Sequence, residues 1–209
     1  EQAPEPVMRS LRQVMRGVNY LMNRAGFPAP ASLKGLARSQ HHVLGETYHS
    51  MAALRYGDYI AKISVTPESD SVKKLTGIQM QINNDSSIRD IVRDFFKKST
   101  ADYAIRAQLC TDLRTMPVED AAVLWKEQES PHQVIGHLHF PQQDTFSPAR
   151  RVYCDDVLSF NPWHGVIEHQ PLGSIMRVRM QAYERSSSFR HRMNTQPRTE
   201  PHQIDDMPD

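Results

Sequence analysis

The stretch of residues 158–194 constrains the fold most, because an irregular approach containing Pro and Gly is followed by a long run without either. Pro171 and Gly173 break the chain, and Ser174 can cap the first free amides of a helix. No Pro or Gly interrupts residues 175–194. The pattern therefore predicts a helix that begins near Ser174 and continues to the end of this stretch.

Two side chains of this predicted helix form a candidate metal-binding pair. Arg179 and Tyr183 are four residues apart, so they share a face, which Ser186 and Arg190 continue. A guanidinium beside a phenol favours the phenolate, because a nearby positive charge stabilises the charged form. A phenolate is a hard anionic ligand suited to ferric iron. Such a pair on its own is most often surface packing, so the surrounding residues decide the interpretation.

These surroundings resemble the C-terminal part of the haem catalase superfamily, in which a Phe-x-Pro segment leads into a helix with Arg-x-x-x-Tyr. The residues at matching places are Phe160, Asn161, Pro162, Arg179 and Tyr183. In that family the Tyr is the proximal haem ligand, and an Arg seven residues later binds a haem propionate, a position held here by Arg190. The resemblance implies haem b as cofactor, with iron bound by Tyr183 and with Phe160, Arg179 and Arg190 in the haem site.

The segment looks most like the smaller bacterial catalase-like proteins, the catalase-related haem peroxidases. It differs from the usual catalase pattern at two places. The spacer between Pro162 and Arg179 is one residue shorter than in typical catalases. Glu184, Arg185 and Ser186 stand where the family usually has Pro-Asp-Thr. Neither departure removes the ligand, but both alter its surroundings.

Alternation of apolar and polar residues predicts strands elsewhere in the chain. Residues 59–65 and 101–113 alternate in this way, and residues 133–140 form a third candidate strand. Residues 152–160 are predicted as a last short strand. Amphipathic patterns predict helices over residues 7–22 and, after the capping sequence Asp-Ser-Ser, over residues 88–96.

The elements predict an α+β fold. By resemblance, it is part of a catalase-like antiparallel β-barrel with flanking helices and a C-terminal haem-ligand helix. The predicted domains are an N-terminal helical and loop segment (1–47), the catalase-like half-barrel with its ligand helix (48–194) and a tail (195–209). The tail is polar, Pro-rich and free of Phe, Tyr and Trp, which predicts disorder or packing on a partner.

Two further groups of metal-binding residue types have ordinary interpretations. His137 and His139 are two apart on a predicted strand, so both point to one face, where a metal pair is conceivable. No third ligand stands at a helpful spacing, and hydrogen-bonded or exposed His is the common case. Cys110 and Cys154 are too few for a disulfide framework and are expected to be reduced thiols.

Composition excludes several classes of partner. The chain has 209 residues, of which 39% are hydrophobic and 23% charged, enough for a core, and its net charge is +1. A charge so close to zero gives no basic field for nucleic acid. No apolar run approaches the ~20 residues of a membrane span, and the first residues show no signal-peptide pattern. A soluble protein is expected, with the compartment, cytoplasmic or periplasmic, left open.

The distal side of a haem site has no counterpart in the sequence. The catalase family carries a distal His there, but His41, His42 and His49 lie in no similar motif. We count about four strands where a catalase barrel has eight, and an unclosed barrel leaves unpaired edges. The chain is therefore predicted to be half of a larger domain, completed by a second polypeptide or a nicked precursor, and to assemble further into a homo-oligomer.

The leading functional hypothesis is a haem enzyme of catalase type that acts on hydrogen peroxide or organic hydroperoxides. Hydroperoxide rearrangement occurs on the same fold, and fold does not decide between these reactions. A non-catalytic haem-binding or sensing module is the second class of hypothesis. A structural remnant that binds no haem is the third.

Overall fold

The computed structural model describes residues 5–24, 26, 41–82, 84–201, 203 and 206–208. It divides into two units, Glu1–His42 with Ile78–Met80, and Val43–Gly77 with Gln81–Asp209. The first unit contains helix α1 (Glu5–Arg24), which confirms the helix predicted over residues 7–22. Parts of the predicted segments 1–47 and 195–209 lie outside the described residues, and the proposed domain boundaries stay predictions.

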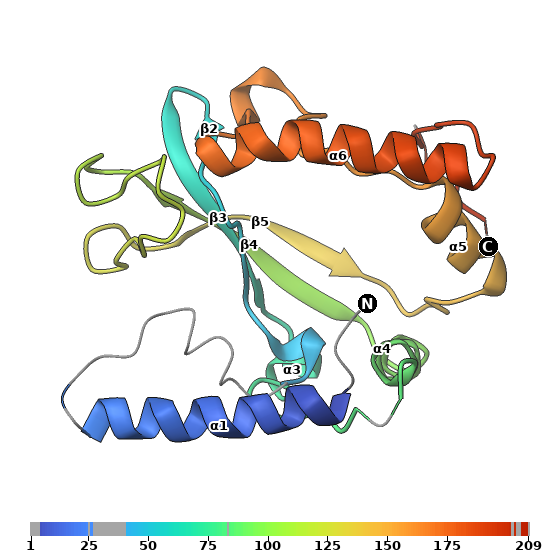
Figure 1. Ribbon diagram of the computed structural model, residues 1–209, viewed down its shortest axis with the longest axis horizontal. Coiled ribbons are helices and arrows are strands. Elements are labelled where there is room, and N and C mark those ends of the chain that lie inside the picture. Colours follow the sequence, from blue (N-terminus) through green and yellow to red (C-terminus); the bar gives the residue numbers. More distant parts are fainter. Residues whose placement is uncertain are drawn as a thin grey trace. The chain divides into compact units, whose positions relative to one another are not determined.

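The second unit is built on an antiparallel five-stranded sheet (Figure 1). Its strands are β1 (Tyr48–His49), β2 (Leu54–Tyr56), β3 (Tyr59–Pro67), β4 (Ala101–Leu109) and β5 (Gln133–Phe140). The order is β1-β3-β4-β5, and β2 also pairs with β3. Within the part of the chain that is described, β5 pairs with β4 alone, and the sheet is not closed into a barrel.

Two apolar clusters are built around the sheet. The first contains Val72 (0% exposed), Phe96 and Tyr103, and the Tyr103 hydroxyl donates to the Leu44 carbonyl at 2.8 Å. Burial raises the pKa of this phenol to about 12. The second cluster joins Ala53 and Met116 to Trp125. Together the clusters bury residues from the long strands, from the helices and from the loop between β4 and β5.

Helix α4 (Ser87–Phe96) confirms the helix predicted before β4, but its start differs from the prediction. Ser86 is the N-cap residue but its side chain makes no capping hydrogen bond; instead, the side chain of Asn84 accepts from the Ser86 amide at 2.9 Å and from the Ser87 hydroxyl. Phe96 is buried, whereas Ile88 is 41% exposed and does not belong to the core. The second unit also contains the short helix α3 (Asp70–Lys73) and the 3₁₀ turn η1 (Val43–Gly45).

Two strand predictions were wrong in part. β4 ends at Leu109 rather than near Leu113, because Asp112 organises a turn by accepting from the Arg114 amide at 2.9 Å and from the Met116 amide at 2.8 Å. Residues 152–160 are not a strand. Helix α5 (Pro148–Val152) continues into the π-helical turn η2 (Tyr153–Val157), and the Ser147 side chain caps α5 by accepting from the Arg150 amide at 3.1 Å. No helix in the described ranges has the length and apolarity needed to cross a membrane.

Candidate functional site

Helix α6 (Ser174–Met193) carries the candidate ligand and confirms the predicted helix. Its start is fixed by Gly173, whose φ of +91° suits glycine and whose position leaves no room for a side chain. Ser174 does not cap the helix as predicted, because its hydroxyl donates to the Glu119 carbonyl at 2.8 Å. Arg177 donates to both carboxylate oxygens of Glu119, at 3.0 and 2.7 Å, so the first turn is tied to the loop after β4.

The segment that precedes α6, residues 158–173, which we call the approach, is bound to β2. The Leu172 amide donates to the Ala53 carbonyl at 3.0 Å, and Pro171 forms an isolated antiparallel bridge with Leu54. The Arg55 amide donates to the Gln170 carbonyl at 2.8 Å, just after the 3₁₀ turn η3 (Ile167–His169). These contacts between backbone groups place the beginning of α6 next to the sheet, as Figure 1 shows.

Arg179 and Tyr183 meet as their spacing predicted. An amino group of Arg179 donates to the Tyr183 hydroxyl oxygen at 2.7 Å, and the guanidinium carbon lies 5.2 Å from the centre of the phenol ring. Both side chains are half-buried. The contact leaves the phenol oxygen beside the positive charge of the guanidinium.

The Tyr183 side chain lines a pocket of about 420 Å³ between the segment after η2 and the C-terminal half of α6. The lining residues are Leu158, Ser159, Phe160, Ala182, Tyr183, Ser186, Ser187 and Arg190. Three of the four predicted site residues, Tyr183, Phe160 and Arg190, therefore share one pocket. Arg179 is joined to it through its bond to Tyr183 and lines a separate hollow of about 250 Å³ beside Pro162 and Met176.

Arg190 links the two walls of this pocket, which we call the Tyr183 pocket. Its guanidinium donates to the carbonyls of Leu158 and Asp155, the latter at 3.3 Å, and lies 3.4 Å from the Ser159 hydroxyl. A guanidinium has five N–H donors, so these contacts leave donors for a carboxylate in the pocket.

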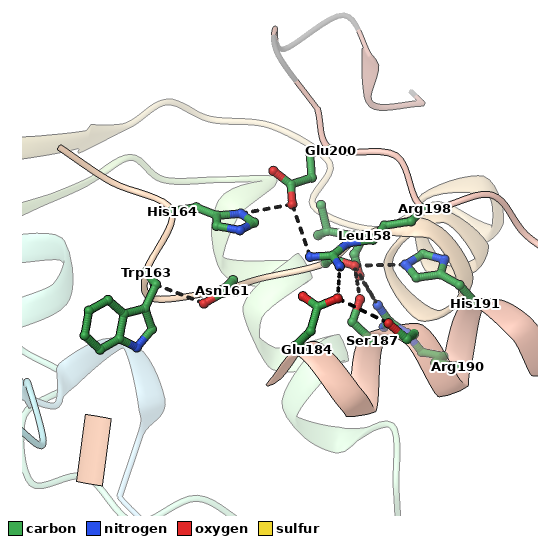
Figure 2. Close-up of polar contacts among 12 residues, drawn as sticks. Leu158, Asn161, Trp163, His164, Glu184, Ser187, Arg190, His191, Arg198 and Glu200 are labelled. Atoms are coloured by element: carbon green, nitrogen blue, oxygen red, sulfur yellow. Dashed lines mark hydrogen bonds and ion pairs between the residues drawn. The ribbon is translucent and has the colours of Figure 1, made fainter. Parts of the chain in front are cut away.

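The sequence did not single out a polar cluster beside Arg190 (Figure 2). The Ser159 hydroxyl lies 2.8 Å from the Ser187 hydroxyl and 2.9 Å from Nε2 of His191. His191 is only 4% exposed, and its Nδ1 has no hydrogen-bond partner among the described residues. The four-residue spacing of Ser187 and His191 on α6 was the available signal, whereas nothing in the sequence paired Ser159 with them.

The other candidate residues lie apart from the Tyr183 pocket. Nδ1 of His137 contacts Glu68 at 2.6 Å and Nδ1 of His139 contacts Asp102 at 2.5 Å, so each exposed His has a carboxylate partner. Among the described residues, no group of three or more His, Cys, Asp or Glu side chains could hold a metal ion. The His49 ring packs edge-on against His132 with centroids 5.6 Å apart and does not line the Tyr183 pocket.

No protein-family model and no curated protein sequence matches this chain. Solved catalase structures do match it. A fungal catalase matches with a TM-score of 0.52 and 15% identity, over 72% of this chain and 32% of the catalase chain. A bacterial catalase matches with a TM-score of 0.50 and 12% identity, over 88% of this chain and 35% of the catalase chain. Catalase A from Saccharomyces cerevisiae has 0.54 at 14% over 90% of this chain and 37% of its own. The chain thus spans about a third of the length of these catalases, and it has a catalase-like α+β fold.

Proposed function

We propose that this chain forms the proximal side of a haem site in a catalase-like protein that acts on hydrogen peroxide or an organic hydroperoxide. The observation that carries the proposal is the 2.7 Å contact between Arg179 and the Tyr183 oxygen at the wall of the Tyr183 pocket. Tyr183 would bind the haem iron, and Arg179 would donate a hydrogen bond to the ligand oxygen. Arg190 would pair with a propionate carboxylate.

The residues of the Tyr183 pocket fit one face of a haem. They combine the Tyr183 oxygen as a ligand for ferric iron, a guanidinium with free donors, and the ring of Phe160, which is 73% exposed and available to pack on a flat macrocycle. Haem iron, when bound, supplies the redox chemistry with peroxide. The chain's own contribution is to hold the iron through the Tyr183 oxygen and to orient the carboxylates at the pocket rim.

A titration of the purified chain with hemin tests this function. We expect a Soret band that saturates near one equivalent, and oxygen release on adding peroxide once the complete protein is assembled. Binding without any turnover in the complete protein would favour the alternative of a haem-binding or sensing module. Conversion of an organic hydroperoxide without oxygen release would favour rearrangement chemistry. No saturable hemin binding would contradict the proposed site.

Arg179→Leu should weaken hemin binding at least about tenfold, because a hydrogen bond from a charged donor contributes about 1.5–3 kcal/mol. Absorption titrations with hemin measure the effect. Arg177→Leu, on the same helix but bonded to Glu119, is the matched control. Equal hemin affinity in the Arg179 variant and the parent would contradict the role of Arg179.

We also propose that a second polypeptide carrying the distal residues completes the sheet along β5. Four large apolar side chains of this edge strand remain 36–50% exposed: Val134, Ile135, Leu138 and Phe140. An edge strand also presents unpaired amide and carbonyl groups, which template the addition of another strand. The matched catalases extend well beyond the part that this chain covers, so the occupant with the most support is the remainder of such a domain.

Without that second polypeptide, the chain should self-associate through β5. Ile135→Lys should weaken the association at least about tenfold, because an edge lysine opposes strand addition. Sedimentation velocity over a concentration series measures this, and Val178→Lys, at a 69% exposed position on α6, controls for the added charge. A chain that stays monomeric at high concentration would contradict the open edge. A native preparation whose denatured mass is the 24.0 kDa chain alone, and which is haem-loaded and active, would contradict the second polypeptide.

A further inference from the structure

The segment after α6 turns back and contacts the helix next to Tyr183. Thr195 has a φ of +53°, and its amide donates to the Arg192 carbonyl at 3.4 Å. Arg198 then reaches Glu184, the residue that follows Tyr183, with its amino group 2.6 Å from the carboxylate oxygen. The side chains of Arg198 and Glu184 are 31% and 51% exposed, so this ion pair is largely open to water. Glu184 is one of the residues at which the sequence departs from the catalase pattern.

The same segment also contacts the approach that leads to α6 (Figure 2). Glu200 accepts from Nδ1 of His164 at 2.9 Å, and its carboxylate lies 3.7 Å from the second amino group of Arg198. Glu184, Arg198, Glu200 and His164 therefore form a continuous row of polar contacts, which we call the clasp. The clasp joins α6, the C-terminal segment and the approach.

The approach is attached to α6 at a second point. Trp163 donates from its indole nitrogen to the Met176 carbonyl at 3.0 Å. Trp163 and His164 belong to one tight turn, in which the side chain of Asn161 accepts from the Trp163 amide at 3.0 Å and its carbonyl accepts from the His164 amide at 3.0 Å. Met176 and Glu184 are eight residues apart, or about 12 Å along a helix. The two attachments thus lie on either side of the turn that carries Arg179.

We propose that Arg198 is a positioning residue for the Tyr183 pocket, holding the approach segment that bears Phe160 at a fixed distance from the helical turn that bears Tyr183. The inference rests on the proposed haem site and extends it to a residue that touches neither the iron nor the substrate. Phe160 stands between Ser159, which α6 holds directly, and the Asn161–His164 turn, which the clasp holds. Without the clasp, the Asn161–His164 turn stays attached to α6 through the bond from Trp163 to Met176, but it loses its attachment near Tyr183.

Glu184 and Arg198 reinforce each other's charges in the clasp. The guanidinium of Arg198 lowers the pKa of the Glu184 carboxyl, and that carboxylate in turn raises the pKa of Arg198. Partly exposed ion pairs contribute modestly and are weakened by salt. We therefore expect an effect on hemin affinity of about fivefold at low ionic strength, and less at 1 M salt.

The experiment compares Arg198→Gln with Arg177→Gln in the full chain. Arg177 forms a similar two-residue ion pair with Glu119 near the start of α6, so its variant removes a comparable contact that is not part of the clasp. The first readout is hemin affinity at low and high salt. The second, in the haem-free chain, is the emission of Trp163 in a Trp125→Phe background, which leaves one tryptophan. A cycle with Glu184→Gln tests whether the two residues act together.

Arg198→Gln should weaken hemin binding about fivefold at low salt and less at 1 M salt, and should shift the Trp163 emission, whereas Arg177→Gln should change neither. Arg198→Lys should restore part of the affinity. Equal effects of the two Gln variants would overturn the positioning role, and so would additive losses from the Glu184 and Arg198 variants. If the parent binds no hemin, the proposed function fails, but the clasp is still tested by the Trp163 emission: an unchanged spectrum in Arg198→Gln overturns it.

Discussion

Tyr183→Phe should weaken hemin binding about 100-fold, equivalent to about 2.7 kcal/mol, and should shift or remove the Soret band. The substitution deletes the oxygen that Arg179 contacts at 2.7 Å and leaves the ring that lines the Tyr183 pocket. Packing is therefore preserved while the proposed ligand is lost. Absorption titrations with hemin measure the effect, together with a thermal melt that confirms the fold.

Tyr59→Phe is the matched control for this prediction. Tyr59 is 65% exposed at the start of β3 and lines no part of the Tyr183 pocket, so removal of its hydroxyl should leave hemin binding unchanged. An unchanged Soret band and affinity in the Tyr183 variant would rule out the proposed ligand. A loss of the same size in both variants would show that the change is not specific to the pocket.

Gly173→Ala should destabilise the second unit by about 3 kcal/mol. Its φ of +91° is unfavourable for a residue with a side chain, which costs about 1–3 kcal/mol. A Cβ at this position would also lie 2.4 Å from the Val118 carbonyl oxygen, so the backbone must move. Because Gly173 immediately precedes α6, we expect the movement to disturb the Arg177–Glu119 pair as well. Urea unfolding measures the change in free energy.

Gly57→Ala is the control that separates the cost of a positive φ from the cost of a clash between the added Cβ and Val118. Gly57 also has a positive φ, +62°, but a Cβ there would meet nothing within 4 Å. Its substitution should therefore cost only about 1 kcal/mol. If Gly173→Ala costs no more than Gly57→Ala, the close approach to Val118 does not constrain the start of α6.

Elements with a clear local pattern were predictable from the sequence. The alternating residues 59–65 lie within β3, and the helix beginning at Ser174 has the predicted extent within a residue or so, because alternation and a long uninterrupted helical run are local properties. The four-residue spacing of Arg179 and Tyr183 likewise determined their contact. The role of Tyr183 as a haem ligand stays a prediction.

What the sequence could not predict depends on distant partners. The sequence predicted Ser174 as a helix cap, but its hydroxyl donates a hydrogen bond to the carbonyl of Glu119, which is distant in the chain. The wrong strand prediction at residues 152–160 could have been avoided from nearby residues, because Ser147 followed by Pro148 is a helix-start signal. For residues 195–209, composition alone gave no indication that Arg198 would find Glu184 or that the backbone of Pro208 would accept from Arg150 at 2.9 Å.

The anchoring of α6 to the loop after β4 has a consequence for folding order. Ser174 and Arg177 contact Glu119 across 55 and 58 residues of chain, so the loop between them must close before α6 can dock. The β3 and β4 strands pair along most of their length and need no contribution from α6. Because contacts between distant residues form slowly, we expect the helix carrying Tyr183 to dock late, on a sheet that is already formed. Cofactor capture would then follow assembly of the sheet.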